Sequence, residues 1–370
     1  MDYRVEPATI ARFVRERPFG ALVVVLALVL LFDLVAGLLT GDIATATVAT
    51  YLWDGAVVGV IVGLAGIGLS MTYAILNFAN FSHGDMITSG AFAGWVAAFL
   101  VAGVGRIDVG RLVILGGRNG INAGTLGTSV TNTPLAILVG FVVAIVLTIA
   151  LALLIDRLVY RPMRDQGAIA LLIASIGVAL ALRYLIAFVF QSGLRPVTAT
   201  DQIPRVTVPI GTGGINVDAH EVTIVVVSLL LMAGVHLLLQ RTKLGTAMRA
   251  MADNEDLALI TGIPTERVVR ATWIVGGGLT GAAGFLVVLE RGTIFFQLGW
   301  ILLLLIFAAV ILGGIGSIYG AMAGGLVIGV TSRLSLVWIP ADFGTAAAFV
   351  IMILVLLFRP TGLFRGVTTA

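Results

Sequence analysis

The sequence predicts an all-α, polytopic membrane protein, a bundle of about ten transmembrane helices. Of its 370 residues, 59% are hydrophobic and only 11% are charged, and the mean hydropathy is +1.11. A soluble domain carries roughly 25% charged residues. A water-soluble core cannot absorb this much apolar surface, so the surrounding medium must be lipid. Strands of membrane β-barrels alternate apolar and polar residues, and the long apolar runs of this chain do not.

Ten stretches match the template of a spanning helix, which is about 20 mostly apolar residues. The first stretch has no clear signal-peptide cleavage site and further spans follow it, so we expect it to be retained. The last three are short or interrupted by glycine. In chain order, the predicted spans are 19–39, 54–76, 84–104, 134–156, 168–190, 221–240, 268–289, 298–314, 317–336 and 343–358.

Arg and Lys gather in short cytoplasmic loops, so the basic segments between the spans predict the orientation. They cluster in four segments, 1–18, 157–164, 241–267 and 359–370. The exception is loop 105–133, which contains Arg106, Arg111 and Arg118 but is long enough to count only weakly for orientation. Ten spans with a cytoplasmic N-terminus put all four segments on the cytoplasmic side of the cell membrane. The predicted organisation is a cytoplasmic segment 1–18, a transmembrane domain 19–358 with external loops 105–133 and 191–220, and a cytoplasmic tail 359–370.

The cytoplasmic loop 241–267 interleaves apolar and charged residues. Its sequence DNED, residues 253–256, suits the start of a short helix, where carboxylates cap open amides and favour the helix dipole. Gly262 would end that helix, and Pro264 would prevent it from resuming. We expect one or two short amphipathic helices at the inner face, which act either as a solvated connector or as a docking site for a partner.

Small residues four positions apart let membrane helices approach closely. With 46 Gly in the chain, we expect a tightly packed bundle in which some glycines also permit broken helices. The glycine pairs with this spacing are Gly59/Gly63, Gly277/Gly281, Gly316/Gly320, Gly320/Gly324 and Gly325/Gly329.

The chain lacks the residues that most catalytic and nucleotide-binding sites need. There is no Cys, which excludes disulfides, thiolate metal sites and thiol catalysis. No GxxxxGK[ST], HExxH or GxSxG motif occurs. His83 and Asp85 are too few to form a metal site. The basic residues indicate membrane orientation rather than nucleic-acid binding. We therefore expect a protein that is not an enzyme and that holds no cofactor or metal of its own.

The segment NFANFSHGDM, residues 77–86, places two Asn, a Ser, a His and an Asp between two apolar runs. One interpretation is a polar cytoplasmic loop, and the other is a helix break that faces a translocation pathway or its inner gate. In the second case, Asn77, Asn80 and Ser82 offer neutral hydrogen-bonding groups to a passing zwitterion or to exposed backbone.

Charged side chains in or beside the spans need partners, because an isolated charge is costly in hydrocarbon. We expect His83 and Asp85 to pair locally and to fix the helix break at Gly84. Arg183 lies in the fifth predicted span, and we interpret it as structural or as snorkelling to the membrane surface rather than as a substrate contact. Its candidate partners are Asp33 and Glu290.

Five segments in consistent order resemble the branched-chain amino acid ABC transporter permeases of the LivH/LivM type. NFANFSHGDMITSGAFAG is similar to the signature NFAHGE…GAY of that family, with Asp85 where Glu is common. DRLVYRPMRDQGAIALLIASIGVAL, the segment from Arg241 to Leu286, AAVILGGIGSIYGAMAGGLVIGV and LLFRPTGLF also match. The resemblance extends from about residue 52 to residue 366.

The resemblance implies a permease subunit of an ATP-binding-cassette importer for branched-chain amino acids or related small polar solutes. It implies a second, related permease subunit, two cytoplasmic ATPases that bind ATP and Mg, and an external solute-binding protein. The alternative is a secondary transporter or channel that works alone, for which loop 241–267 need not dock to a partner.

The resemblance also implies roles for two groups of residues. The translocation pathway would include the polar residues of the signature segment, Asn77, Asn80, Ser82, His83 and Asp85. Loop 241–267 would couple the chain to an ATPase, through a small helix that converts closure of the ATPase into helix movement. The positions that fall in the matching coupling motif are Gly245, Arg249, Ala250, Glu255, Ala258 and Gly262.

Overall fold

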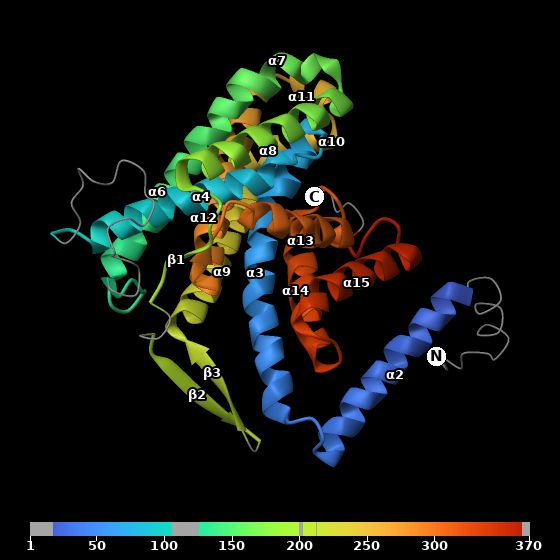
Figure 1. Ribbon diagram of the computed structural model, residues 1–370. Helices are drawn as coiled ribbons and strands as arrows, with labels where there is room; N and C mark the ends of the chain where they lie inside the picture. Colours follow the sequence, from blue (N-terminus) through green and yellow to red (C-terminus); the bar gives the residue numbers. More distant parts are fainter. Residues whose placement is uncertain (1–17, 106–125, 200–202, 212, 365–370) are drawn as a thin grey trace.

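The computed structural model describes residues 18–105, 126–199, 203–211 and 213–364. The predicted helical bundle is confirmed (Figure 1), and each predicted span coincides with a helix. Among the described residues, eight helices are long and apolar enough to cross a membrane, and two shorter apolar stretches, Leu28–Thr40 of α2 and Leu298–Gly313 of α13, accompany them. The apolar helices are α2 (Pro18–Thr40), α3 (Thr45–Leu76), α4 (Ser82–Ala102), α6 (Pro134–Ile155), α8 (Ala168–Phe190), α9 (Ala219–Arg241), α12 (Thr265–Arg291), α13 (Leu298–Gly313), α14 (Ile318–Leu334) and α15 (Gly344–Phe358).

The molecule has two distinct ends (Figure 1). One end, here called the hairpin end, carries the antiparallel strands β2 (Arg205–Ile210) and β3 (Gly213–Asp218). The other, here called the short-helix end, carries α7 (Arg161–Met163), α10 (Lys243–Asp253) and α11 (Glu255–Ile260). The all-α prediction therefore holds for the bundle but missed the strands in loop 191–220. Most of the predicted loop 105–133 and of the predicted terminal segments lies outside the described residues.

A second small sheet joins two distant loops. The strand β1 (Arg195–Pro196) pairs antiparallel with β4 (Thr293–Ile294), and the Val197 amide donates to the Gly292 carbonyl at 2.9 Å. This pairing fixes the segment between α12 and α13 against the connection that follows α8.

Helix α6 continues without a break into the segment predicted as a cytoplasmic connection. A π-helical turn at Asp156–Tyr160, the helix α7 and a 3₁₀ turn at Arg164–Gln166 extend it. Arg164 holds this extension in place, because its guanidinium pairs with Asp156 and with Glu266, each at 2.7 Å. Gly167, with a φ of 85°, then turns the chain into α8.

Helices α3 and α12 form the centre of the bundle. In the most apolar stretch of each, 89% and 83% of the residues are buried, against 28% for α6, α8 and α9. The outer helices therefore bury one face against the centre and present the other to their surroundings. Helix α3 begins nine residues before its predicted span, because the mixed sequence TATVATYLW continues the helix beyond the apolar run.

The glycine pairs at four-residue spacing mark helix crossings, as expected. A Cβ atom at Gly325 would lie 2.5 Å from the Gly63 Cα and 2.8 Å from the Gly59 carbonyl oxygen, so α14 and α3 touch backbone to backbone. Gly316 is the exception among the predicted pairs. With a φ of 83°, it lies in the turn between α13 and α14 rather than in a helix.

Candidate functional site

The signature segment is a break between two helices. Helix α3 ends at Leu76, and Asn77 takes a left-handed conformation with a φ of 52° while its amide donates to the Tyr73 carbonyl. Asn is one of the few residues that adopt this conformation readily. Helix α4 begins at Ser82, so the break comprises residues 77–81.

Gly84 does not fix this break, contrary to expectation, because it lies in the first turn of α4. A Cβ atom at Gly84 would lie 2.7 Å from the carbonyl oxygen of Gly299 and 3.0 Å from the Cβ of Leu303. Gly84 is therefore needed for the close crossing of α4 and α13.

Most of the break lies inside the bundle, since Phe78 and Asn80 are buried and only Asn77 is exposed. The ring of Phe81 contacts the ring of Phe307, with 5.1 Å between centroids. Phe307 lies six residues before the end of α13 at Gly313, which corresponds to about 9 Å along a helix. The break therefore packs against α13 about two turns before that helix ends.

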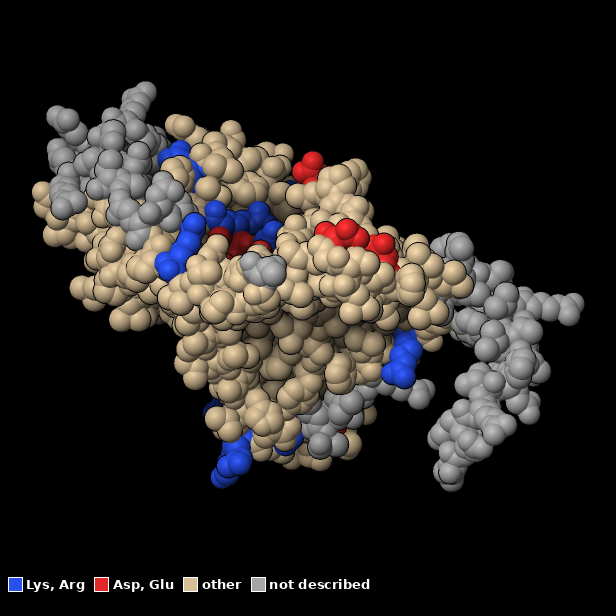
Figure 2. Space-filling model, turned by 90° about the horizontal axis from the view of Figure 1, so that it is seen from below, with Lys and Arg blue, Asp and Glu red and all other residues tan. Residues whose placement is uncertain are grey.

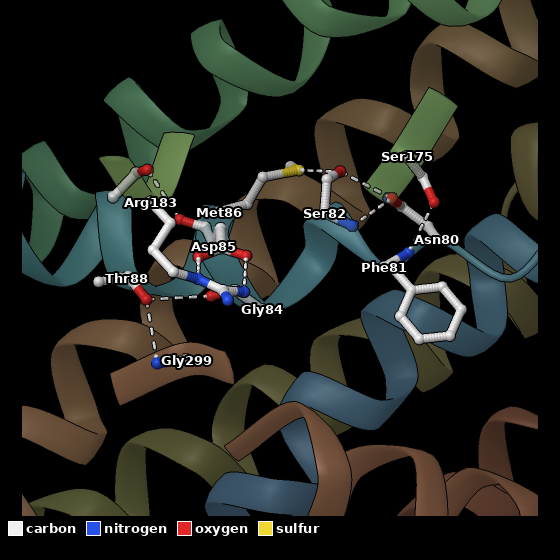
Figure 3. Close-up of polar contacts among 11 residues, drawn as sticks. Asn80, Phe81, Ser82, Gly84, Asp85, Met86, Thr88, Ser175, Arg183 and Gly299 are labelled. Carbon is white, nitrogen blue, oxygen red and sulfur yellow. Dashed lines mark hydrogen bonds and ion pairs between the residues drawn. The ribbon is translucent and has the colours of Figure 1, made fainter. Parts of the chain in front are cut away.

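Asn80 is the centre of a buried hydrogen-bond network (Figure 3). Its Oδ1 atom accepts from the Ser82 amide at 3.1 Å, from the Ser82 hydroxyl at 2.7 Å and from the Tyr160 hydroxyl at 3.2 Å. Asn80 and Ser82 have no exposed surface, and Tyr160 has 1%. The network caps the start of α4 and ties it to the end of α6.

Two buried donors near this network remain unpaired within the described residues. They are Asn80 Nδ2 and Trp273 Nε1, and the Trp273 ring stacks on Tyr160 with 5.5 Å between centroids. An unpaired buried donor costs about 1–3 kcal/mol. Two of them near one tyrosine therefore lower the stability of this part of the bundle.

Asp85 forms a buried ion pair with Arg183 of α8. The guanidinium Nε and Nη2 atoms donate to Asp85 Oδ1 and Oδ2 at 3.0 and 2.9 Å (Figure 3). The Arg183 guanidinium also lies 4.3 Å from the centre of the Trp300 ring, at cation–π distance. Arg183 is therefore structural, as expected, but it does not snorkel.

The expected partners of Arg183 are bound elsewhere. Asp33 accepts from the Trp338 indole at 2.8 Å, and Glu290 pairs with Arg333 at 2.9 Å. The sequence interpretation was wrong because it counted Asp85 as part of a polar loop.

His83 and Asp85 do not pair with each other, contrary to expectation. Positions two apart in a helix point in nearly opposite directions. Asp85 therefore faces α8, while His83 faces the centre of the bundle. There its Nε2 atom lies 3.0 Å from the Ala65 carbonyl oxygen of α3, and its Nδ1 atom lies 3.4 Å from the Thr280 hydroxyl of α12.

Helix α13 starts inside the bundle, beside α4. The amide of Gly299, in the first turn of α13, donates to the Thr88 hydroxyl at 2.9 Å (Figure 3). Thr88 in turn donates to the Gly84 carbonyl at 3.2 Å. A side chain of α4 thus satisfies one of the open amides that every helix start presents.

A cavity of about 230 Å³ at the short-helix end connects the break with the loop 241–267. Asn77 from the break and Arg249 from α10 both line it, together with Gly316 from the turn before α14. Asn77 is exposed there, unlike the other polar residues of the signature segment. The cavity brings a predicted pathway residue and a predicted coupling residue to the same surface.

Loop 241–267 folds into the expected pair of short helices. Asn254 caps α11, since its side chain accepts from the Leu257 amide at 2.8 Å. Gly262 ends α11 with a φ of 86°, and the Ile263 amide donates to the Ala258 carbonyl at 3.0 Å. This is the bonding pattern of a glycine helix terminus.

The predicted coupling residues separate into three kinds of position. Gly245 and Ala258 are buried, and a Cβ atom at Gly245 would lie 2.5 Å from the Leu239 Cα. These two therefore pack α10 and α11 onto the bundle. Arg249 and Ala250 are half-buried, and Glu255 and Gly262 are exposed. Within the described residues, no group of three or more His, Asp or Glu could hold a metal.

The chain is similar to known membrane transport proteins. Residues 51–358 match the family model described as the permease component of branched-chain amino acid transport systems. The high-affinity branched-chain amino acid transport system permease protein BraD of Pseudomonas aeruginosa is 30% identical over 312 residues, which cover 84% of this chain and 94% of the relative. The corresponding LivH protein of Escherichia coli K12 is 29% identical, with the same coverage. The probable LivH protein of Methanocaldococcus jannaschii is 28% identical over 81% of this chain and 87% of the relative. No solved structure matches the chain.

Proposed function

The chain belongs to the family of branched-chain amino acid transport permease components, and from this premise we propose how it works within an ATP-binding-cassette importer. The observation that carries the proposal is the extent of the family match, which runs from Tyr51 in α3 to the last residue of α15. The solute that the proposal assigns is a branched-chain amino acid or a related small polar molecule.

The proposed assembly contains a second, related permease subunit, two cytoplasmic ATPases that bind ATP and Mg, and an external solute-binding protein. The ATPases would supply the P-loop motif, which this chain does not contain. We propose that the short-helix end faces the cytoplasm, because basic residues cluster there. They include Arg157, Arg161, Arg164, Arg241 and Lys243.

The surface proposed to contact an ATPase is α11. Ala258 anchors this helix with 2% exposure, while Leu257, Leu259 and Ile260 are 54%, 59% and 79% exposed. The helix lies at the short-helix end (Figure 1), and a group of exposed apolar side chains of this kind marks an interaction surface. A stand-alone transporter has no use for this apolar surface, so the observation favours a docking role.

The first test is uptake by proteoliposomes. The chain, reconstituted with the proposed partners, is expected to accumulate labelled leucine only when ATP is present on the side of the ATPases. Uptake that continues after the ATPases are omitted would replace the proposal with an ion-coupled transporter or a channel.

The second test is the double substitution Leu257→Asp with Ile260→Asp. We expect the protein to remain folded, because both side chains point away from the bundle. Removal of two central apolar contacts weakens a typical interface by about 2 kcal/mol or more. ATP-driven uptake and co-purification of the ATPase should therefore fall together by at least about tenfold.

The matched control is Val206→Asp, which places the same charge at an apolar position of β2 that is 66% exposed. It lies at the hairpin end and should leave ATPase binding unchanged. Equal loss in both variants would show that α11 has no specific coupling role.

The third test concerns Asn80. Asn80→Leu removes the acceptor for three hydrogen bonds and leaves the Tyr160 hydroxyl and the start of α4 without that partner. Each buried group that is left unpaired costs about 1–3 kcal/mol, which disfavours the present conformation of the break. If transport needs that conformation, uptake should fall by at least about tenfold while the assembly stays intact. Normal uptake with normal assembly would make the break an ordinary connection between two helices.

A further inference from the structure

A cavity of about 160 Å³ lies between five helices on the side of the molecule opposite α10 and α11. It is bordered by α3, α12, α13, α14 and the start of α15. Helices α12 and α14 both run toward the hairpin end and contribute residues from their last turns. Seen from the hairpin end, basic side chains border a hollow that holds acidic side chains (Figure 2).

The polar wall of the cavity contains charges of both signs. Glu290 Oε1 accepts from Arg333 Nη2 at 2.9 Å, and Glu290 Oε2 lies 3.8 Å from Arg291 Nε, which is too long for a hydrogen bond. The side chains of Glu290, Arg291 and Arg333 are 17%, 34% and 38% exposed.

This arrangement leaves both donors and an acceptor available for a ligand. Among the described residues, Arg333 Nη1 and the Arg291 guanidinium have no hydrogen-bond partner, and Glu290 Oε2 accepts no hydrogen bond. A guanidinium matches the geometry of a carboxylate, and a carboxylate accepts from an ammonium group. The rest of the lining includes the apolar residues Val58, Ile61, Val287, Leu302 and Leu305.

We propose that this cavity binds the solute as a zwitterionic amino acid, with Arg291 and Arg333 on its carboxylate, Glu290 on its ammonium group and the apolar lining residues around its branched side chain. The proposal rests on the proposed transport function and adds a specific binding site to it. A simple carboxylic acid or amine satisfies only one half of the polar wall, so the site selects molecules that carry both charges.

The cavity leads toward the polar interior of the bundle. Ile61 lines it, and Ala65, one turn further along α3, is the residue whose carbonyl oxygen contacts His83. One turn of α3 therefore separates a residue that lines the cavity from the carbonyl group that contacts His83.

The absence of Cys makes a labelling experiment possible. Thr345→Cys introduces a thiol at an exposed residue that lines the cavity. The rate at which a small thiol reagent modifies it is measured in the assembled transporter in lipid nanodiscs, with and without L-leucine. A ligand at about ten times its dissociation constant should slow modification about tenfold if it occupies the cavity.

Matched variants separate binding from indirect effects. Thr207→Cys, exposed on β2, should be modified at a rate that leucine does not change. Arg333→Gln in the Thr345→Cys background should raise the leucine concentration needed for protection by about tenfold or more, since a hydrogen bond to a charged group is lost. Isocaproate, which lacks the amino group, and isoamylamine, which lacks the carboxylate, should each protect much less than leucine.

Leucine uptake by the unsubstituted assembly is measured in parallel, so that the two proposals can fail separately. If that assembly takes up leucine but Thr345→Cys is not modified, or is modified at the same rate with leucine present, the cavity is not the binding site. The charged cluster would then only anchor helix ends at the membrane surface. If the unsubstituted assembly takes up no branched-chain amino acid, the proposed function itself is wrong.

Discussion

Arg183→Leu is expected to destabilise the chain by about 3–5 kcal/mol, because it leaves Asp85 buried and without its partner. Asp85 has no exposed side-chain surface, and both of its carboxylate oxygens accept from Arg183. The measurement is the fraction of folded, monodisperse protein that survives heating in lipid nanodiscs. Asp85→Leu should have an effect of similar size, because it leaves the buried guanidinium unpaired.

The double variant Asp85→Leu with Arg183→Leu should be more stable than either single variant. An apolar pair of similar volume avoids the desolvation of both charges, and such replacements are often neutral. Arg205→Leu, at an exposed position of β2, is the control for loss of a positive charge. If the double variant loses as much stability as the two single variants lose together, the two residues do not act as a pair.

The ion pair also explains how an outer helix is attached to the helix break. The buried residues of α8 are Leu171, Ser175, Ala179, Arg183 and Ile186, which form a single stripe. Two of them bind the signature segment, since the Phe81 amide donates to the Ser175 hydroxyl at 3.0 Å and Arg183 binds Asp85. We expect transport to fall in both single variants, because α8 then no longer holds the start of α4.

The fold was largely predictable from the sequence because lipid imposes a simple length rule on apolar helices. The glycine spacing also predicted close helix packing, which the α3–α14 crossing shows, since four-residue spacing puts small residues on one face of a helix. It did not predict which helices cross. Helix boundaries at polar ends were less predictable. Helix α3 starts in a mixed sequence, and α6 continues through a segment rich in charge, because Arg164 finds acidic partners eight and about one hundred residues away.

The candidate site was predictable in its location but not in its contacts. The residues of NFANFSHGDM pointed to a break, and Asn77 could have suggested its position, because Asn tolerates a left-handed conformation. The partners of Asn80 and Asp85 come from α6 and α8, and no local pattern reveals them. One signal was available: Asp85 falls inside the predicted span 84–104, so two opposite charges in neighbouring spans could have been paired.

Gly325→Val is expected to prevent normal folding of the chain, because α3 and α14 touch through their backbones at this point. A new Cβ atom would meet the Gly63 Cα at 2.5 Å and the Gly59 carbonyl oxygen at 2.8 Å. Backbone atoms cannot rotate away as a side chain can, so the two helices must move apart. Overpacking of a core typically costs about 1–3 kcal/mol, and the β-branched valine adds further atoms to the clash.

The consequence reaches both ends of the molecule, since α3 carries Val58 and Ile61 of the cavity beside Glu290 and Arg333 and also leads into the break at Asn77. Gly177→Val in α8 is the matched control, because no atom lies within 4 Å of the position where its Cβ would be. Gly325→Val should lose both the yield of folded protein and leucine uptake, whereas Gly177→Val should retain both. Equal behaviour of the two variants would mean that the α3–α14 crossing tolerates separation, and that packing between these helices does not position the break.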